Sequence, residues 1–333
     1  MTLDKDQLFM NVALNYARRG LGFVKQGRPS VGCVLVRKGS IVAAARTGDG
    51  GQPHAEVAAI EIASYEAKGA TAYVTLEPCA HQGRTPPCAD ALIEAGIVRC
   101  VVACRDPFPQ VNGKGIEILQ KAGIEVVEGV CEEEARLVNA GFFLTVEEKR
   151  PYVTCKLMVS ADGKIASAPG ERTMISGDIA NRHTHLQRSR HDAILVGSET
   201  YLVDQPQLTT RVKGIQHKAL KVVLDGQGRV KNADGYEVIT DKTVNTKDIK
   251  AVLAYLALKG VTRLLVEGGT KVHKSFLESG FVDEFQLCTS PHRLGGEGVL
   301  GLTKADIEAS NGLKHQKTRV LGEDTLEIYA RAD

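Results

Sequence analysis

Short apolar runs alternate with amphipathic segments along the chain, and this alternation limits the fold more than any other feature. In the first half, apolar residues recur at helical spacing over residues 6–19, and a Lys-Gly-Ser turn joins two apolar runs, 31–36 and 41–45. Further helices are predicted near 54–67, 88–95 and 114–122, and further strands over 72–76, 98–103 and 124–127. Strands separated by helices predict a largely parallel sheet with helices on both faces, which is an α/β fold.

A charged segment that ends in proline, residues 147–151, divides the chain. The alternation resumes after it, with strands predicted over 152–158, 193–196, 221–224, 263–266, 284–288 and 327–330 and helices near 178–189 and from Thr270. A chain of 333 residues is long enough for two hydrophobic cores, because single domains usually span about 100–200 residues. The sequence therefore predicts two α/β domains, residues 1–148 and 149–333.

The charge balance gives no support to a nucleic-acid partner. The 42 basic and 40 acidic side chains leave a net charge of +2, and no long basic run is present. Trp is absent and aromatic residues make up only 5%, so the composition does not indicate a surface on which bases stack. No apolar stretch approaches the roughly 20 residues that span a bilayer, so no membrane partner is predicted either.

The N-terminal segment and the cysteines indicate a cytoplasmic protein. Residues 1–20 carry early acidic residues and an amphipathic pattern, not the apolar core of a signal peptide. The eight cysteines are too few and too scattered for a disulfide framework in a chain of this length. In a reducing compartment such cysteines are core residues or metal ligands, and only Cys79 and Cys88 lie in a context that suggests ligation.

Four residues of the first half form a pattern typical of a catalytic zinc site. His54 and Glu56 lead into a predicted helix, and Cys79 ends a predicted strand nine positions before Cys88. Catalytic zinc takes three protein ligands and leaves a fourth position for water, and His54, Cys79 and Cys88 supply three suitable donors. Glu56 would take a proton from that water and deliver it to a departing amine, as the glutamate of zinc deaminases does. The pattern predicts a hydrolytic deaminase.

A structural zinc site is the alternative for the same residues. Structural sites normally close with a fourth Cys or His, and His81 could supply it. With a fourth protein ligand, zinc would have no open position for water, and the position of Glu56 next to the site would be unexplained. The catalytic interpretation is therefore preferred.

The second half contains one candidate for phosphate binding. The predicted strand 263–266 ends in Glu267-Gly268-Gly269-Thr270 and leads into a helix. Glycines at such a turn let backbone N–H groups approach a phosphate at the helix N-terminus. The run is not G-x-G-x-x-G, so a Rossmann fold is not indicated, and a plain tight turn explains it equally well.

The run EPCAHQGRTPPC, residues 77–88, resembles the bifunctional deaminase–reductase family of riboflavin biosynthesis. Most zinc deaminases separate the two cysteines by two residues, whereas eight residues lie between Cys79 and Cys88. The resemblance extends through both halves, over residues 70–79, 90–96, 156–166, 175–177, 191–197, 208–211 and 266–269.

The resemblance implies two folds and two activities. The first domain would have a cytidine-deaminase-like three-layer fold and would deaminate the ring of 2,5-diamino-6-ribosylamino-4(3H)-pyrimidinone 5′-phosphate. Arg84 and Thr85 would help to bind this phosphorylated substrate, unless they are only a solvated loop and a turn. The second domain would have a dihydrofolate-reductase-like fold and use NADPH to reduce the ribosyl group of 5-amino-6-(5-phosphoribosylamino)uracil to ribityl. The family also implies a homo-oligomer, a dimer or a tetramer.

By the same resemblance, residues of the second domain divide between cofactor and substrate. The residues expected to contact NADPH are Met158, Met174, Thr200, Asp204, Gly268, Gly269 and Thr270. The residues expected to contact the substrate are Arg172, Arg188, Leu208, Arg211 and Glu267. Arg188 and Arg211 would supply charge for the substrate phosphate. Considered without the family, Leu208 is a core residue, Asp204 a turn former and Arg188 part of a solvated helix face.

Several positions depart from the pattern of the family. Arg28 stands where the deaminase usually has an Asn that helps to place the substrate, and arginine cannot accept a hydrogen bond. In the second domain, Arg172, Met174, Gln205 and Gly226 replace the usual Ser, Trp, Asp and Ser. These departures leave open a zinc deaminase of another base with a degenerate reductase domain. A nonenzymatic scaffold is a third hypothesis, but the complete zinc pattern argues against it.

Overall fold

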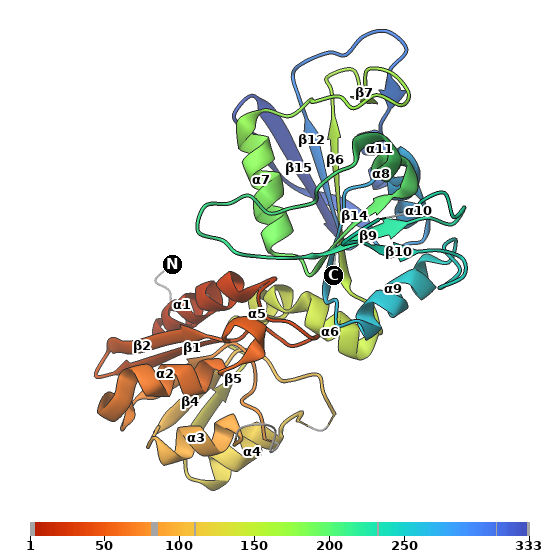
Figure 1. Ribbon diagram of the computed structural model, residues 1–333. Coiled ribbons are helices and arrows are strands. Elements are labelled where there is room, and N and C mark those ends of the chain that lie inside the picture. Colours follow the sequence, from red (N-terminus) through yellow and green to blue (C-terminus); the bar gives the residue numbers. More distant parts are fainter. Residues whose placement is uncertain (1–3, 81–85, 110, 232, 311, 332–333) are drawn as a thin grey trace. The chain divides into compact units, whose positions relative to one another are not determined.

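The computed structural model describes residues 4–80, 86–109, 111–231, 233–310 and 312–331. The chain divides into two compact units, Met1–Glu148 and Lys149–Asp333, each with its own sheet (Figure 1). The division falls inside the charged segment that precedes Pro151. No helix in the described part of the chain is long and apolar enough to cross a membrane.

The first unit is built on a five-stranded sheet in the order β2-β1-β3-β4-β5. β1 pairs antiparallel with β2 and β3, whereas β3, β4 and β5 run parallel. The strands are β1 (Gly32–Arg37), β2 (Ser40–Arg46), β3 (Thr71–Val74), β4 (Arg99–Val102) and β5 (Glu125–Glu128). The helices are α1 (Lys5–Gly20), α2 (Ala55–Ala63), α3 (Cys88–Glu94), α4 (Lys114–Lys121), α5 (Glu132–Val138) and α6 (Ala140–Glu147). Two 3₁₀ turns, Asp49–Gly51 and Ser64–Ala67, flank α2.

Helices cover both faces of this sheet. Residues 32–36 of β1 are all buried, and successive strand residues point to opposite faces, so neither face is left to solvent. α1 packs on β1, β2 and β3 and contacts α5, while α2 packs on β1 and β2 and contacts α3, which contacts α4 (Figure 1). The expected three-layer arrangement is confirmed.

The second unit contains an eight-stranded sheet in the order β10-β9-β8-β11-β6-β12-β15-β14. The strands from β10 to β12 in this order run parallel, and β15 and β14 add an antiparallel edge. The strands are β6 (Tyr152–Val159), β8 (Ala193–Gly197), β9 (Leu220–Leu224), β10 (Glu237–Ile239), β11 (Arg263–Val266), β12 (Glu284–Thr289), β14 (Leu313–Leu321) and β15 (Asp324–Arg331). The short strands β7 (Lys164–Ala166) and β13 (Val299–Leu300) pair with each other. The helices are α7 (Asp178–Ser189), α8 (Ser198–Asp204), α9 (Ile249–Leu258), α10 (Thr270–Glu278) and α11 (Lys304–Glu308).

A buried ion pair fixes the start of β6 against the turn before β12. The guanidinium of Arg150 donates to both carboxylate oxygens of Asp283, at 2.7 and 3.0 Å, and both residues are almost fully buried. Asp283 also accepts the backbone N–H of Val153 at 2.8 Å. Asp283 therefore links the start of β6 to the residue that precedes β12.

Most predicted elements are present with small shifts at their ends, and α7 and β11 have the predicted bounds. The sequence did not predict α5, α6, α8, α9, α11, β10, β14 or the pair β7 and β13.

Candidate active sites

The start of α2 brings His54 and Glu56 to the same end of the helix. His54 is the N-cap residue, and its carbonyl accepts the N–H of Ala58 at 3.0 Å, so the helix begins at the next residue. Ala55 and Ala59 are fully buried, and their small side chains let α2 pack closely on the sheet. Glu56 lies in the first turn and is only 3% exposed.

The two cysteines reach His54 from the segment that follows β3 and from the start of α3; Cys79 lies five residues after the end of β3, where the sequence predicted the end of the strand itself. The backbone N–H of Cys88 donates to Sγ of Cys79 at 3.2 Å, and the N–H of Ala89 donates to the carbonyl of Cys79 at 3.3 Å. Nδ1 of His54 lies 3.2 Å from Sγ of Cys88 and 3.6 Å from Sγ of Cys79.

These three donor atoms fit a zinc ion. They all lie within 4.8 Å of one another. Tetrahedral zinc with Zn–S near 2.3 Å and Zn–N near 2.0 Å needs donor separations of about 3.5–3.8 Å. The soft thiolates and the imidazole are a usual zinc donor set, so the residues fit the metal in both chemistry and spacing.

The site also shifts the titration of its groups. The hydrogen bond between the two cysteines is the largest cause that lowers the pKa of Cys79, to about 4, which favours a thiolate. Burial, and next the negative charge of Cys79, raise the pKa of Glu56 to about 7. A carboxyl that titrates near neutrality can both accept and return a proton.

Glu77, to which the sequence assigned no role, anchors the segment after β3 that carries Cys79. Its buried carboxylate accepts four backbone N–H groups, from Asp106, Gly113, Gly115 and Ile116, at 2.9–3.4 Å. Two of these donors belong to the first turn of α4, where a negative charge is favourable. In the sequence, only its position two residues before the metal ligand Cys79 could have pointed to this role.

Arg28 contacts the loop that leads into His54. Its guanidinium donates to the carbonyl of Gly50 at 3.2 Å, and a Cβ added at Gly51 would lie 2.6 Å from its Cδ. Arg28 is therefore held against residues 50 and 51, three to four positions before His54. The predicted residues Arg84 and Thr85, and His81, lie outside the described residues.

The second unit contains a cavity of about 860 Å³. Seven residues predicted from the sequence line it: Met158, Thr200, Asp204, Glu267, Gly268, Gly269 and Thr270. The glycine turn between β11 and α10 is tight, because a Cβ added at Gly268 would lie 2.8 Å from Cβ of Val272. Nδ1 of His273, which is fully buried, lies 3.2 Å from the carbonyl of Gly269 and helps to fix this turn.

The remaining predicted residues lie outside the cavity lining. Met174 is 69% exposed, and the guanidinium of Arg172 lies 4.0 Å from its sulfur. Burial raises the pKa of Asp204, and the charge of Arg172 opposes this rise. The side chain of Leu208 packs in a core with Ile194 and Leu265, as expected from the residue type alone.

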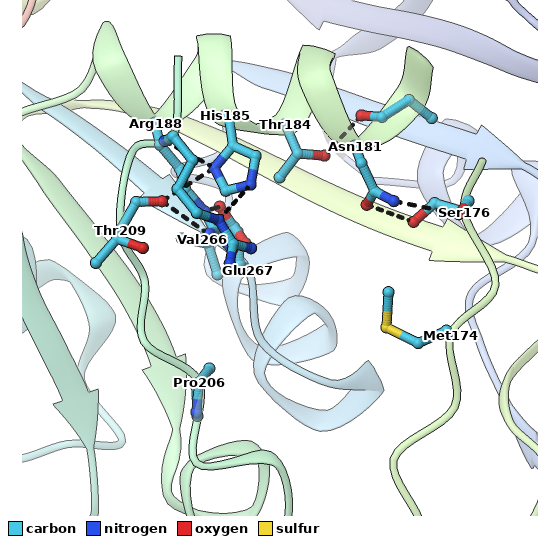
Figure 2. A network of polar contacts seen from close by, with 12 residues as sticks. Met174, Ser176, Asn181, Thr184, His185, Arg188, Pro206, Thr209, Val266 and Glu267 are labelled. Carbon is cyan, nitrogen blue, oxygen red and sulfur yellow. Dashed lines mark hydrogen bonds and ion pairs between the residues drawn. The ribbon is translucent and has the colours of Figure 1, made fainter. Parts of the chain in front are cut away.

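Arg188 and Arg211 belong to a polar network beside the cavity. Figure 2 shows Arg188 of this network with Glu267 and Thr209. Arg188 pairs with Glu267 through two hydrogen bonds of 2.8 and 2.6 Å, and it donates to the carbonyl of Thr209 at 3.2 Å. Burial favours a raised pKa for Glu267, but the hydrogen bond and charge of Arg188 outweigh it and lower the pKa. Glu267 connects the network to the cavity, since it lines the cavity and holds Arg188.

Two family models match the chain. The model of the cytidine and deoxycytidylate deaminase zinc-binding region matches residues 3–104, which include the histidine–cysteine cluster. The model of the RibD C-terminal domain matches residues 151–326, which include the cavity. The chain is therefore a two-domain enzyme that joins a zinc deaminase to a reductase.

Relatives cover both halves of the chain. The riboflavin biosynthesis protein RibD of Aquifex aeolicus is 37% identical over 359 residues, which cover 99% of this chain and 100% of the relative. RibD of Escherichia coli K12 is 37% identical over 329 residues, which cover 88% of this chain and 89% of the relative. The chain belongs to the RibD family of riboflavin biosynthesis.

Solved structures agree with this assignment. RibD of Acinetobacter baumannii (form 1) superposes with a TM-score of 0.87 at 33% identity, covering 99% of both chains. A Thermotoga maritima structure described as a diaminohydroxyphosphoribosylaminopyrimidine deaminase/5-amino-6-(5-phosphoribosylamino)uracil reductase superposes with a TM-score of 0.86 at 32% identity, covering 98% of this chain and 99% of that chain.

Membership in this family confirms several predictions. The enzyme has a cytidine-deaminase-like domain and a dihydrofolate-reductase-like domain, acts in riboflavin biosynthesis, and uses zinc and NADPH as cofactors. The alternative of a deaminase with a degenerate second domain is not favoured, because the reductase family model matches that domain and the relatives cover it.

Proposed function

We propose that the first unit deaminates 2,5-diamino-6-ribosylamino-4(3H)-pyrimidinone 5′-phosphate at the centre formed by His54, Cys79 and Cys88. The observation that supports this proposal most is the convergence of three zinc donors within 4.8 Å beside the buried Glu56. The substrate is inferred from the name of the Thermotoga maritima relative.

The residues of this site divide into ligands and a proton carrier. A zinc ion held by these ligands would act as a Lewis acid and make bound water nucleophilic near neutral pH. Glu56 would take one proton from this water and give it to the ring nitrogen, while the remaining O–H adds to the ring carbon. It would then carry the second proton, from that hydroxyl, to the departing amine, so that ammonia leaves and a carbonyl forms. The N–H of Cys88 stabilises the thiolate of Cys79, which keeps Cys79 in its ligating form.

In the second unit, NADPH occupies the cavity and the phosphorylated substrate lies beside it. The N-terminus of α10 and the turn at Gly268 and Gly269 present backbone N–H groups to a cofactor phosphate. The hydroxyl of Thr200 lies beside Gly269 at the same end of the cavity. NADPH supplies the hydride, so the protein chiefly binds and orients. Met158, Met174 and Asp204 are assigned to the cofactor, and Arg172, Leu208 and Glu267 to the substrate.

Arg188 and Arg211 bind the phosphate of the reductase substrate in this proposal. Arg188 contacts the carbonyl of Thr209, two residues before Arg211, and Arg211 contacts His185 on the same helix as Arg188. Planar guanidinium groups match the oxygens of a phosphate. Arg84 and Thr85 are assigned to the substrate of the first unit. The expected homo-oligomer stays a prediction that light scattering on the full chain tests, and a monomer mass contradicts it.

Separate measurement of metal and of the two activities tests these assignments. Cys79→Ala is expected to lose zinc and ammonia release but to keep NADPH oxidation with 5-amino-6-(5-phosphoribosylamino)uracil. Cys100→Ala is the matched control, because Cys100 is a fully buried core cysteine outside the cluster. If Cys79→Ala keeps full zinc content and deamination, the metal assignment is wrong.

A further inference from the structure

α7 presents His185 and Arg188 to the segment that carries Arg211. Residues three positions apart lie on the same face of a helix, and both side chains reach the carbonyl of Thr209 (Figure 2). Nδ1 of His185 lies 3.0 Å from this carbonyl, and a terminal nitrogen of Arg188 lies 3.2 Å from it. The segment is thus held to α7 at one carbonyl by two side chains.

The second ring nitrogen of His185 contacts Arg211. Nε of Arg211 donates to Nε2 of His185 at 3.2 Å, and the backbone N–H of Arg211 lies 3.3 Å from Nδ1. The two contacts at Nδ1 cannot both be hydrogen bonds, because Nδ1 would donate to the carbonyl of Thr209 but would have to accept from the N–H of Arg211. The shorter contact, to the carbonyl, forms when Nδ1 carries the proton. A neutral ring protonated at Nδ1 has a lone pair at Nε2, which is what Nε of Arg211 needs.

We propose that His185 is a positioning residue, which orients Arg211 toward the phosphate of the reductase substrate. This inference rests on the proposed function, since it takes the phosphate contact of Arg211 from there. His185 uses Nε of Arg211 and leaves both terminal nitrogens without a protein partner in the described part of the chain. Those two nitrogens are the pair that binds phosphate oxygens side by side.

The surroundings keep this arrangement in place. Burial, followed by the positive charges of Arg188 and Arg211, lowers the pKa of His185, so the ring stays neutral. Leu208, which precedes Thr209 in the chain, is 3% exposed, and its side chain anchors the segment 208–211 in the core. The segment is therefore fixed on one side by Leu208 and on the other by His185.

Ribose 5-phosphate binding and steady-state kinetics test the inference on the full-length enzyme. His185→Ala should weaken ribose 5-phosphate binding, measured by calorimetry, about tenfold, the effect of one hydrogen bond to a charged group. It should raise KM for 5-amino-6-(5-phosphoribosylamino)uracil by a similar factor and leave kcat within about twofold. His185→Gln, whose side-chain oxygen can accept from Nε of Arg211, should recover much of the loss.

Controls separate this role from a general effect on folding. His183→Gln changes a half-buried histidine of the same helix that contacts Gln286 instead of Arg211, so it should leave KM and binding unchanged. In an Arg211→Ala background, His185→Ala should add nothing, because it acts through Arg211.

Two different results would overturn the inference. If Arg211→Ala weakens ribose 5-phosphate binding and His185→Ala does not, or if their effects simply add, His185 has no positioning role and the proposed function stands. If Arg211→Ala leaves binding unchanged, the proposed phosphate contact is wrong, and the inference fails with it.

Discussion

Replacing Glu56 with Gln removes the proposed proton carrier and changes little else. The two side chains have nearly the same shape, and Glu56 is 3% exposed, so the packing at the start of α2 should be kept. The three ligand atoms belong to other residues, His54, Cys79 and Cys88. Glu56→Gln is therefore expected to hold one zinc per chain.

The expected loss lies in the chemical step. A positioned acid–base group contributes about 10²–10⁴-fold to a rate, which is about 3–5 kcal/mol of activation free energy. A glutamine cannot accept the proton of water near neutral pH, so kcat for deamination should fall by this factor. The reductase residues lie in the unit Lys149–Asp333, so NADPH oxidation should be unchanged and serve as an internal reference.

Ammonia release, NADPH oxidation and zinc content are measured on the same preparation. Glu61→Gln, an exposed position on the same helix, is the matched control and should match the parent enzyme in all three. Deamination by Glu56→Gln within about threefold of the parent rate would refute the role of Glu56. A loss of zinc in this variant would show instead that Glu56 supports the metal.

Three further predictions concern Arg28 in the first unit and the stability of the second unit. Arg28 donates to the carbonyl of Gly50 and cannot accept, so Arg28→Asn should lower KM for deamination by about two- to tenfold; unchanged kinetics would contradict this. Burial lowers the pKa of His191 to about 3, whereas a histidine of the unfolded chain titrates near 6.5. Because only the unfolded chain binds this proton between those values, His191 should contribute about 2 kcal/mol to the fall in the free energy of unfolding from pH 8 to pH 5. His191→Gln should reduce that fall by about this amount in urea titrations, and an unchanged fall would contradict the assignment. Asp283→Asn removes the charge opposite the buried Arg150 and should lower the free energy of unfolding by about 3–5 kcal/mol; a loss below about 1 kcal/mol would count against a structural role of this pair.

The metal cluster could be predicted from the sequence because its signals are local. His54 and Glu56 are two positions apart at a helix start, and Cys79 and Cys88 flank one loop. The glycine turn after β11 was visible for the same reason, as glycines between a strand and a helix. In each case the chemistry depends on neighbours in the sequence.

Contacts between distant segments could not be predicted in this way. Glu77 accepts N–H groups that lie 29–39 positions further along the chain. His185 contacts residues 24 and 26 positions away, and nothing in α7 itself indicates them. Such roles depend on the packing of the sheet, which the alternation of strands and helices leaves undefined.

The missed elements have weak periodicity for physical reasons. β14 is an edge strand with nearly all of its residues exposed, so it lacks the apolar alternation of a half-buried strand. α6 contains apolar residues around most of its circumference, including the buried Phe142 and Phe143, and shows no clear amphipathic face.

The central claim is that one chain deaminates a phosphorylated pyrimidine and then reduces the product. Incubation of the full-length enzyme with 2,5-diamino-6-ribosylamino-4(3H)-pyrimidinone 5′-phosphate, following ammonia and NADPH separately, tests it most directly. Ammonia should be released with or without NADPH, and one NADPH should be consumed for each ammonia when the cofactor is present. Ammonia release without any NADPH consumption, or no ammonia release from the zinc-loaded enzyme, would contradict the account.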